Sequence, residues 1–218
     1  MSPQIKLVVL ISGNGSNLQA IIDEIEQGTL HADITRVISN RPEVSGLQRA
    51  QRANIATQVI DHKAYPSRES FDQAMMNAID KEHPDLIVLA GFMRILSDSF
   101  VEHYLGRLIN IHPSLLPNYQ GLNTHQRILD ANEAKHGATV HYVIPELDSG
   151  PIILQASLPV LSEDNAETLA QRVHQLEHKL YPESIRRIAA GQVTFSNGVV
   201  NFEQQPITYA QQQYKINA

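Results

Sequence analysis

The first half of the chain alternates between short apolar runs and longer stretches in which apolar residues recur every three or four positions. Residues 5–12 (IKLVVLIS) and 86–90 (LIVLA) are apolar and lie next to glycine, as expected of strands buried on both faces of a sheet. Residues 18–25 place leucine and isoleucine at helical spacing, and Gly28 follows them. This alternation predicts parallel strands connected by helices.

Other segments extend the same pattern as far as residue 111. They predict further strands at residues 32–39, 57–60 and 108–111. They also predict a helix at residues 45–53 and two more helices, which begin after the capping residues Ser67 and Ser97. The order of these elements predicts a doubly wound, mostly parallel, Rossmann-like α/β sheet, in which ligands bind beyond the carboxyl ends of the strands.

The pattern changes in the second half of the chain. Residues 138–144 and 152–160 are strand-like runs with no helical stretch between them, which predicts antiparallel strands added to the parallel sheet. Residues 165–189 form a long amphipathic helix in this prediction, with Pro182 as a candidate for a bend. From residue 193 we expect a short hairpin and a polar tail.

Composition and charge narrow the class of protein. The net charge of −6 argues against nucleic-acid binding, which needs a basic surface, and the absence of cysteine excludes disulfides and thiolate catalysis. No apolar run reaches the roughly 20 residues of a membrane span, and residues 1–6 lack the features of a signal peptide. We therefore expect a cytoplasmic protein with neither nucleic-acid nor membrane partners.

The loop Gly13-Asn14-Gly15-Ser16-Asn17 follows the first predicted strand and precedes a helix. Glycine lets the backbone approach an anion closely, and the start of a helix offers free N–H groups, so the loop suits a phosphate. A dinucleotide site is disfavoured because Leu18 replaces the third glycine of the fingerprint and no acidic residue ends the second strand. An ordinary strand-to-helix turn remains the alternative.

Asn110 and His112 lie at the end of a predicted strand and, being two positions apart, on the same face of it. An amide donor and an imidazole in one place suit acyl transfer to an amine, which needs oxyanion stabilisation and proton transfer. Asp148 lies in a turn-rich loop, and contact with its carboxylate would favour a charged His112 ring. The alternatives are a strand-end histidine and an ordinary turn aspartate.

Four motifs, taken in order and spacing, carry a family resemblance. They are SGNGSN at residues 12–17, LAGFMRIL at 89–96, NIHPSLLP at 110–117 and LDSGPI at 147–152. With them the chain resembles the folate-dependent formyltransferases, and within these the group that formylates glycinamide ribonucleotide in purine synthesis. The resemblance covers residues 5 to about 190.

The resemblance implies two small-molecule substrates, glycinamide ribonucleotide and the cosubstrate 10-formyltetrahydrofolate, and no metal. For the ribonucleotide it implies that Gly15, Ser16 and Asn17 bind the phosphate. It also implies that Glu177 binds the ribose hydroxyls. For the folate it implies contacts from Arg68, Met93, Arg94, Ile95, Leu96 and Asn110. Asn110 and His112 would polarise the formyl group, and Asp148 would support His112 and an ordered water.

The resemblance also implies how the chain is organised. We expect a single formyltransferase domain, with phosphate binding in residues 1–100, folate binding and catalysis in residues 86–190, and a tail from residue 193. The chain would act as a monomer or a homodimer.

Four residues depart from the choices typical of relatives, namely Asn118, Gln120, Asn123 and Ser149. They leave the three catalytic candidates unchanged. They raise the question of whether the loop after residue 117 contacts substrate as it does in relatives.

Competing functions differ from this one in chain architecture or in chemistry. A formyltetrahydrofolate deformylase would carry a regulatory domain before the first strand, and a methionyl-tRNA formyltransferase would carry a basic RNA-binding domain at its end. His174, Glu177 and His178 match a short zinc-protease pattern on a helix. A sensor of phosphorylated ligands would keep the glycine loop without needing Asn110, His112 and Asp148 to meet.

Overall fold

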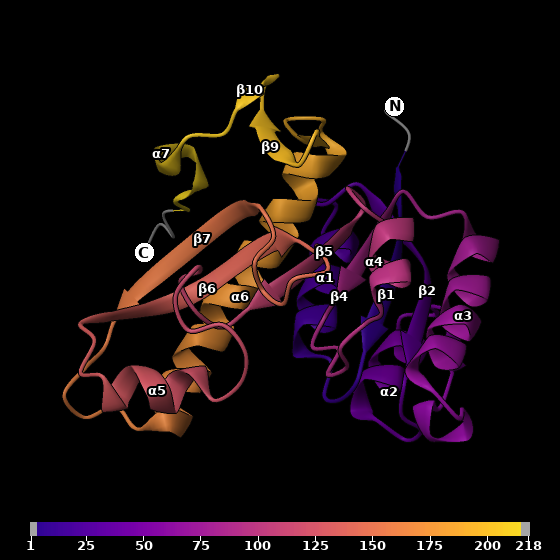
Figure 1. The fold of residues 1–218 in the computed structure, drawn as a ribbon, viewed down its shortest axis with the longest axis horizontal. Helices are drawn as coiled ribbons and strands as arrows, with labels where there is room; N and C mark the ends of the chain where they lie inside the picture. Colours follow the sequence, from indigo (N-terminus) through magenta and orange to yellow (C-terminus); the bar gives the residue numbers. More distant parts are fainter. Residues whose placement is uncertain (1–3, 215–218) are drawn as a thin grey trace. The chain divides into compact units, whose positions relative to one another are not determined.

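A computed structural model describes residues 4–214 of the chain (Figure 1). The first three residues, and the last four residues of the predicted polar tail, lie outside the described part. The chain divides into two compact units, residues 1–110 and residues 111–218, which are described in turn.

The first unit follows the predicted alternation of strands and helices. Its elements are β1 (Ile5–Ile11), α1 (Ser16–Glu26), β2 (Ala32–Ser39), α2 (Ser45–Arg52), β3 (Thr57–Val59), α3 (Arg68–Ile79), β4 (Leu86–Leu89), α4 (Asp98–His103) and β5 (Leu108–His112). Two short 3-10 helices lie at His62–Ala64 and Asp80–Glu82. Strand β5 continues into the second unit.

The second unit contains the antiparallel strands and the longest helix. Its elements are α5 (Thr124–Asp130), β6 (Lys135–Tyr142), β7 (Ile152–Pro159), α6 (Ala166–Ala189), β8 (Val193–Ser196), β9 (Val199–Phe202), β10 (Gln205–Pro206) and α7 (Tyr209–Gln212).

The main sheet has seven strands in the order β3-β2-β1-β4-β5-β6-β7. The pairs from β3 to β5 are parallel, and β6 pairs with β7 in antiparallel register. The predicted fold class, a mostly parallel α/β sheet with antiparallel strands added late in the chain, is therefore confirmed. The predicted hairpin after residue 193 is also present, as part of a small antiparallel sheet with the order β10-β9-β8.

Strand β1 lies at the centre of the first unit because it pairs with β2 on one side and β4 on the other. Its residues from Leu7 to Ile11 are completely buried, which explains the unbroken apolar run. Strand order reverses between β1 and β4, and the loops after these two strands leave the same edge of the sheet. An open α/β sheet places its ligands at such a point.

In the second unit, α6 packs along β6 and β7 (Figure 1). Asn165 caps its start by accepting hydrogen bonds from the backbone N–H groups of Glu167 and Thr168. The buried residues Leu169 and Val173 lie on the face predicted to be apolar. Pro182 lies inside the helix, which continues to Ala189.

Several parts of the second unit differ from the sequence prediction, including the short helix α7 within the predicted polar tail. Strand β6 begins at Lys135, three residues earlier than expected, because His136 is polar in sequence but completely buried in the sheet. Helix α5 was not predicted. It has seven residues, too few to show a helical repeat, and only Thr124 and Ile128 are buried.

Gly15 precedes α1 with a φ of 74°, in the left-handed region that favours glycine. A Cβ atom at this position would lie 2.7 Å from the Cα of Gly46 at the start of α2. The sharp turn of the loop and its close approach to α2 therefore both require glycine.

We predict that Gly15→Ala lowers the free energy of unfolding by about 2–4 kcal/mol, since it adds a backbone clash to the left-handed strain. Gly28→Ala is the matched control, because Gly28 has a φ of 73° but open space around it. The control should cost about 1 kcal/mol, for the strain alone. Urea unfolding measures both, and equal losses would contradict the role of the contact with Gly46.

Candidate active site

Ser12, at the end of β1, joins the loops that follow β1 and β4. Its backbone N–H donates to the carbonyl oxygen of Gly91 at 3.2 Å. Its hydroxyl donates to the side chain of Asn40 at 2.6 Å and accepts the backbone N–H of Met93 at 2.7 Å. This hydroxyl, which was not among the predicted site residues, therefore positions the first residue of the segment expected to bind folate.

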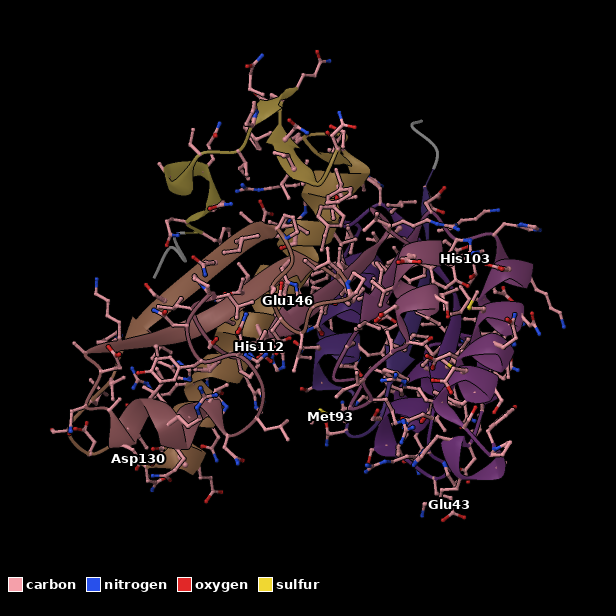
Figure 2. The ribbon with its side chains drawn as sticks, viewed as in Figure 1. Glu43, Met93, His103, His112, Asp130 and Glu146 are labelled. Carbon is pink, nitrogen blue, oxygen red and sulfur yellow. The ribbon has the colours of Figure 1, made fainter. Side chains whose placement is uncertain are left out.

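Asp72 fixes the other end of that segment. The Asp72 side chain is 1% exposed, and one of its carboxylate oxygens accepts the backbone N–H of Ser97 at 2.6 Å. Between the two anchors, the apolar side chains of Met93 (labelled in Figure 2) and Ile95 are 60% and 62% exposed. Exposed apolar side chains on a fixed backbone are typical of a surface that binds a flat, partly apolar ligand.

The glycine loop ends at the first turn of α1, which contains no acidic residue. The guanidinium group of Arg49 in α2 lies against this loop, because it donates to the carbonyl oxygen of Asn14 at 2.9 Å and to the Asn14 side chain at 3.0 Å. A helix start, glycine backbone and an arginine together suit an anion. The sequence reasoning missed Arg49, since nothing in its spacing links it to a loop 35 residues earlier.

The structure brings His112 and Asp148 together. Nδ1 of His112 lies 3.4 Å from Oδ2 of Asp148, and the two side chains are only 7% and 9% exposed. Glu146, labelled with His112 in Figure 2, begins the turn that carries Asp148. The meeting of two residues 36 positions apart is the geometric relation on which the sequence hypothesis depended.

The other ring nitrogen of His112 faces a backbone carbonyl. Nε2 lies 2.9 Å from the carbonyl oxygen of Tyr119, and since that oxygen only accepts, Nε2 carries a proton. With a carboxylate at Nδ1 as well, both ring nitrogens face acceptors. Each ring nitrogen therefore has an acceptor within reach of an N–H group.

Asp148 is held by groups on both sides of its carboxylate. Oδ2 accepts the backbone N–H of Gly121 at 2.9 Å, and Oδ1 lies 3.9 Å from Nε2 of His141. Asp148 itself has a φ of 48°, which is uncommon for a residue other than glycine. Gly150 completes the turn, and a side chain there would overlap the carbonyl oxygen of Tyr142.

His141 is a second histidine at Asp148 that the sequence reasoning missed. It is 2% exposed and lies where the register of β6 against β7 shifts. Burial lowers its pKa, against the opposing effects of its hydrogen bond to the Tyr142 carbonyl and of the Asp148 charge. A neutral His141 therefore lies beside the pair that His112 forms with Asp148. A histidine at the end of a buried strand, just before the Asp148 turn, was the available signal.

The remaining predicted residues occupy defined positions in their own units. Asn110 pairs with Leu89 in the β4–β5 ladder, two residues before His112 on β5. Arg68 is the first residue of α3, and its guanidinium lies 3.6 Å from Glu69. Glu177 is 4% exposed on α6.

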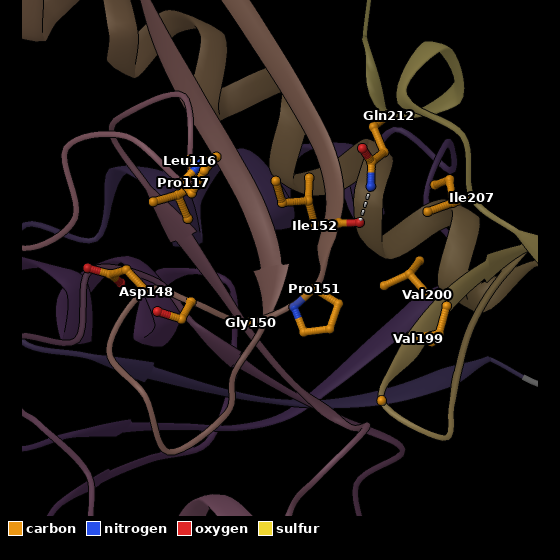
Figure 3. Close-up of a pocket in the computed structure, with 12 residues that line it drawn as sticks. Leu116, Pro117, Asp148, Gly150, Pro151, Ile152, Val199, Val200, Ile207 and Gln212 are labelled. Atoms are coloured by element: carbon orange, nitrogen blue, oxygen red, sulfur yellow. Dashed lines mark hydrogen bonds between the residues drawn. The ribbon is translucent and has the colours of Figure 1, made fainter.

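A cavity of about 420 Å³ lies in the second unit, between the Asp148 turn and the C-terminal hairpin (Figure 3). Its walls are mainly apolar, from Leu116, Pro151, Val199 and Ile207. Asp148 is the one predicted site residue that lines it. The cavity therefore adjoins Asp148, and none of the residues predicted to bind either substrate lines it.

The zinc-protease alternative from the sequence finds no metal site in the described part of the chain. Among residues 4–214, no group of three or more histidine, aspartate or glutamate side chains is placed to hold a metal ion, and this includes the His174–His178 pattern. Over the same residues, no helix combines the length and apolar character of a membrane span.

Comparison with known proteins identifies the class. Residues 5–185 match the formyl transferase family. The chain belongs to this family, and the match spans both the β1 loop and the Asp148 turn.

Its relatives define the group within the family. Phosphoribosylglycinamide formyltransferase of Escherichia coli (strain K12) is 50% identical over 187 residues, which are 86% of this chain and 88% of the relative. The structure of phosphoribosylglycinamide formyltransferase from Coxiella burnetii has 51% identity and a TM-score of 0.93, covering 97% of this chain and 100% of the other. Glycinamide ribonucleotide transformylase 1 from Symbiobacterium toebii has 40% identity and a TM-score of 0.89, with coverage of 93% and 95%. The resemblance predicted from the motifs is confirmed.

A separate histidine pair lies in the same unit as Asp148. Nδ1 of His125 lies 2.9 Å from Nε2 of His136, which is completely buried. Burial, with a smaller effect of His125, lowers the pKa of His136 to about 4. Because an unfolded histidine titrates near 6.5, the unfolded state takes up a proton first as the pH falls. His136 thus contributes stability above about pH 6.5 that is lost as the pH falls toward 4.

We predict that the free energy of unfolding of the wild type falls between pH 7 and pH 5 by about 1–2 kcal/mol more than that of His136→Gln. The reason is that glutamine does not titrate. Urea unfolding at the two pH values measures the difference. His31→Gln is the control, since His31 is exposed and should leave the loss as in the wild type. Equal losses in the wild type and His136→Gln would contradict the prediction.

Proposed function

We propose that this chain transfers the formyl group of 10-formyltetrahydrofolate to the amine of glycinamide ribonucleotide. The observation that carries the proposal is the buried pair of His112 and Asp148 at the end of β5, in a chain of the formyl transferase family. The relatives named above support the choice of substrates, because their names specify this reaction or its ribonucleotide substrate.

In the proposed reaction, the amine attacks the formyl carbon and the carbonyl oxygen takes up negative charge. The Asn110 amide and the charged His112 ring stabilise this oxyanion. The bond from the formyl carbon to the folate nitrogen then breaks. His112 donates a proton to the folate nitrogen as the acid, and the proton that the attacking amine loses restores the charged ring. Asp148 keeps the His112 ring charged and oriented.

For the ribonucleotide, we propose that Gly15, Ser16 and Asn17 hold the phosphate. The left-handed turn at Gly15, the helix start at Ser16 and the nearby Arg49 support this assignment. We propose that Glu177 accepts hydrogen bonds from the ribose hydroxyls, which suits a carboxylate.

For the folate, we propose that Met93, Arg94, Ile95 and Leu96 line the pterin site. The anchors at Ser12 and Asp72 support this, since a fixed backbone presents its polar groups to a flat ring at low entropic cost. Arg68, at the start of α3, would lie nearer the anionic outer end of the folate.

We also propose the cellular setting and the form of the enzyme. The chain would act in the cytoplasm as one catalytic domain, with small-molecule substrates and without nucleic-acid or membrane partners. A monomer or a homodimer would fit this role.

The direct test is an assay of the purified chain with 10-formyltetrahydrofolate and glycinamide ribonucleotide, with water as the competing acceptor. The proposal expects formylated ribonucleotide as the main product. Tetrahydrofolate and free formate in its place would identify a deformylase instead.

We predict that His112→Ala lowers kcat by about 10²- to 10⁴-fold, because it removes both an acid and a positive charge from the reaction. His103→Ala is the matched control, since Nε2 of His103 also lies beside an aspartate, 3.1 Å from Asp80, but on the surface. Steady-state kinetics of the two variants should separate them widely. A kcat near that of the wild type in His112→Ala would count against the assignment.

A further inference from the structure

Residues 119–121 contact the His112–Asp148 pair at both of its ends. The Tyr119 carbonyl oxygen faces Nε2 of His112, and the Gly121 N–H donates to the Asp148 carboxylate. Between them, the Gln120 side chain reaches the Asp148 turn. Three consecutive residues therefore bracket the two proposed catalytic groups.

The Gln120 amide connects this segment to the turn. Its Nε2 donates to the Ser149 hydroxyl at 2.8 Å and to the Asp148 carbonyl oxygen at 3.2 Å. The Ser149 hydroxyl in turn donates to the Leu147 carbonyl oxygen at 3.0 Å, so its lone pairs face the glutamine. The two N–H bonds of one amide thus hold two consecutive residues of the turn.

The segment that carries Gln120 is itself anchored in the second unit. Arg127 of α5 donates to the Gln120 carbonyl oxygen at 2.6 Å, and its guanidinium lies 5.3 Å from the centre of the Tyr119 ring. The Tyr119 hydroxyl donates to Glu133 at 2.7 Å. Gln120 is therefore a link between an anchored segment and a turn whose Asp148 has left-handed backbone geometry.

We propose that Gln120 and Ser149 are positioning residues that set the distance and orientation of Asp148 toward His112. The inference rests on the proposed function, in which that pair is catalytic. Neither residue touches the reacting atoms in this account. Both belong to the four positions expected from the sequence to differ from relatives, and the structure joins them by a hydrogen bond.

The test compares four variants by steady-state kinetics. Gln120→Ala should lower kcat by about 3- to 10-fold, with KM for both substrates within about two-fold, because a lost neutral hydrogen bond loosens a catalytic group without removing a substrate contact. Ser149→Ala should lower kcat less, and Ser149→Thr, which keeps a hydroxyl, should restore it. Gln126→Ala is the matched control, since its amide bonds Asp130 within α5, and it should match the wild type.

Hydrogen exchange at the Gly121 amide gives a readout independent of turnover. Gln120→Ala should speed this exchange by about 3- to 10-fold, since the Gly121 N–H donates to the carboxylate that the glutamine helps to hold. An active wild type together with an unchanged kcat in Gln120→Ala would overturn the inference alone. A wild type without formyl transfer would instead contradict the proposed function.

Discussion

The contact between the His112 imidazole and the Asp148 carboxylate is the interaction on which the proposed chemistry depends. The two groups are almost fully buried, so the carboxylate needs partners to remain charged there. It has them in the Gly121 N–H and the His112 imidazole, while His141 lies 3.9 Å away. In the proposed chemistry, the carboxylate orients the His112 ring, and the positive charge of the protonated ring stabilises the negative charge that develops on an oxygen.

The fold supplies this arrangement through the ends of strands. His112 is the last residue of β5, and Asp148 lies in the turn between β6 and β7, where Gly150 permits a close approach to Tyr142. In the first unit, the loops after β1 and β4 meet at the point where strand order reverses, and the Ser12 hydroxyl joins them. Rigid strands therefore carry short, tightly held loops, and the proposed catalytic groups lie at strand ends and in these loops.

Much of the fold was predictable because its signals are local. The unbroken apolar run of β1 and the capping residues Ser67 and Asn165 each act within a few residues of the chain. The meeting of His112 with Asp148 followed from the family motifs, not from spacing. What could not be predicted depends on tertiary contacts: His136 looks like a loop residue but is buried in β6, and Arg49 reaches back to a loop 35 positions earlier. Likewise, Gln120 and Ser149 were singled out one by one in the sequence, and the hydrogen bond between them depends on the folded loops.

The most direct test of the central claim is a double-mutant cycle in kcat, with His112→Ala, Asp148→Asn and the two combined. Asparagine keeps the shape of Asp148 and an acceptor for the Gly121 N–H but removes the charge. If the two residues work as a unit, the combined variant should be no slower than the slower single variant, within about three-fold. Losses that multiply, so that the combined variant is slower by the product of the two single effects, would show that the residues act independently and would contradict the account.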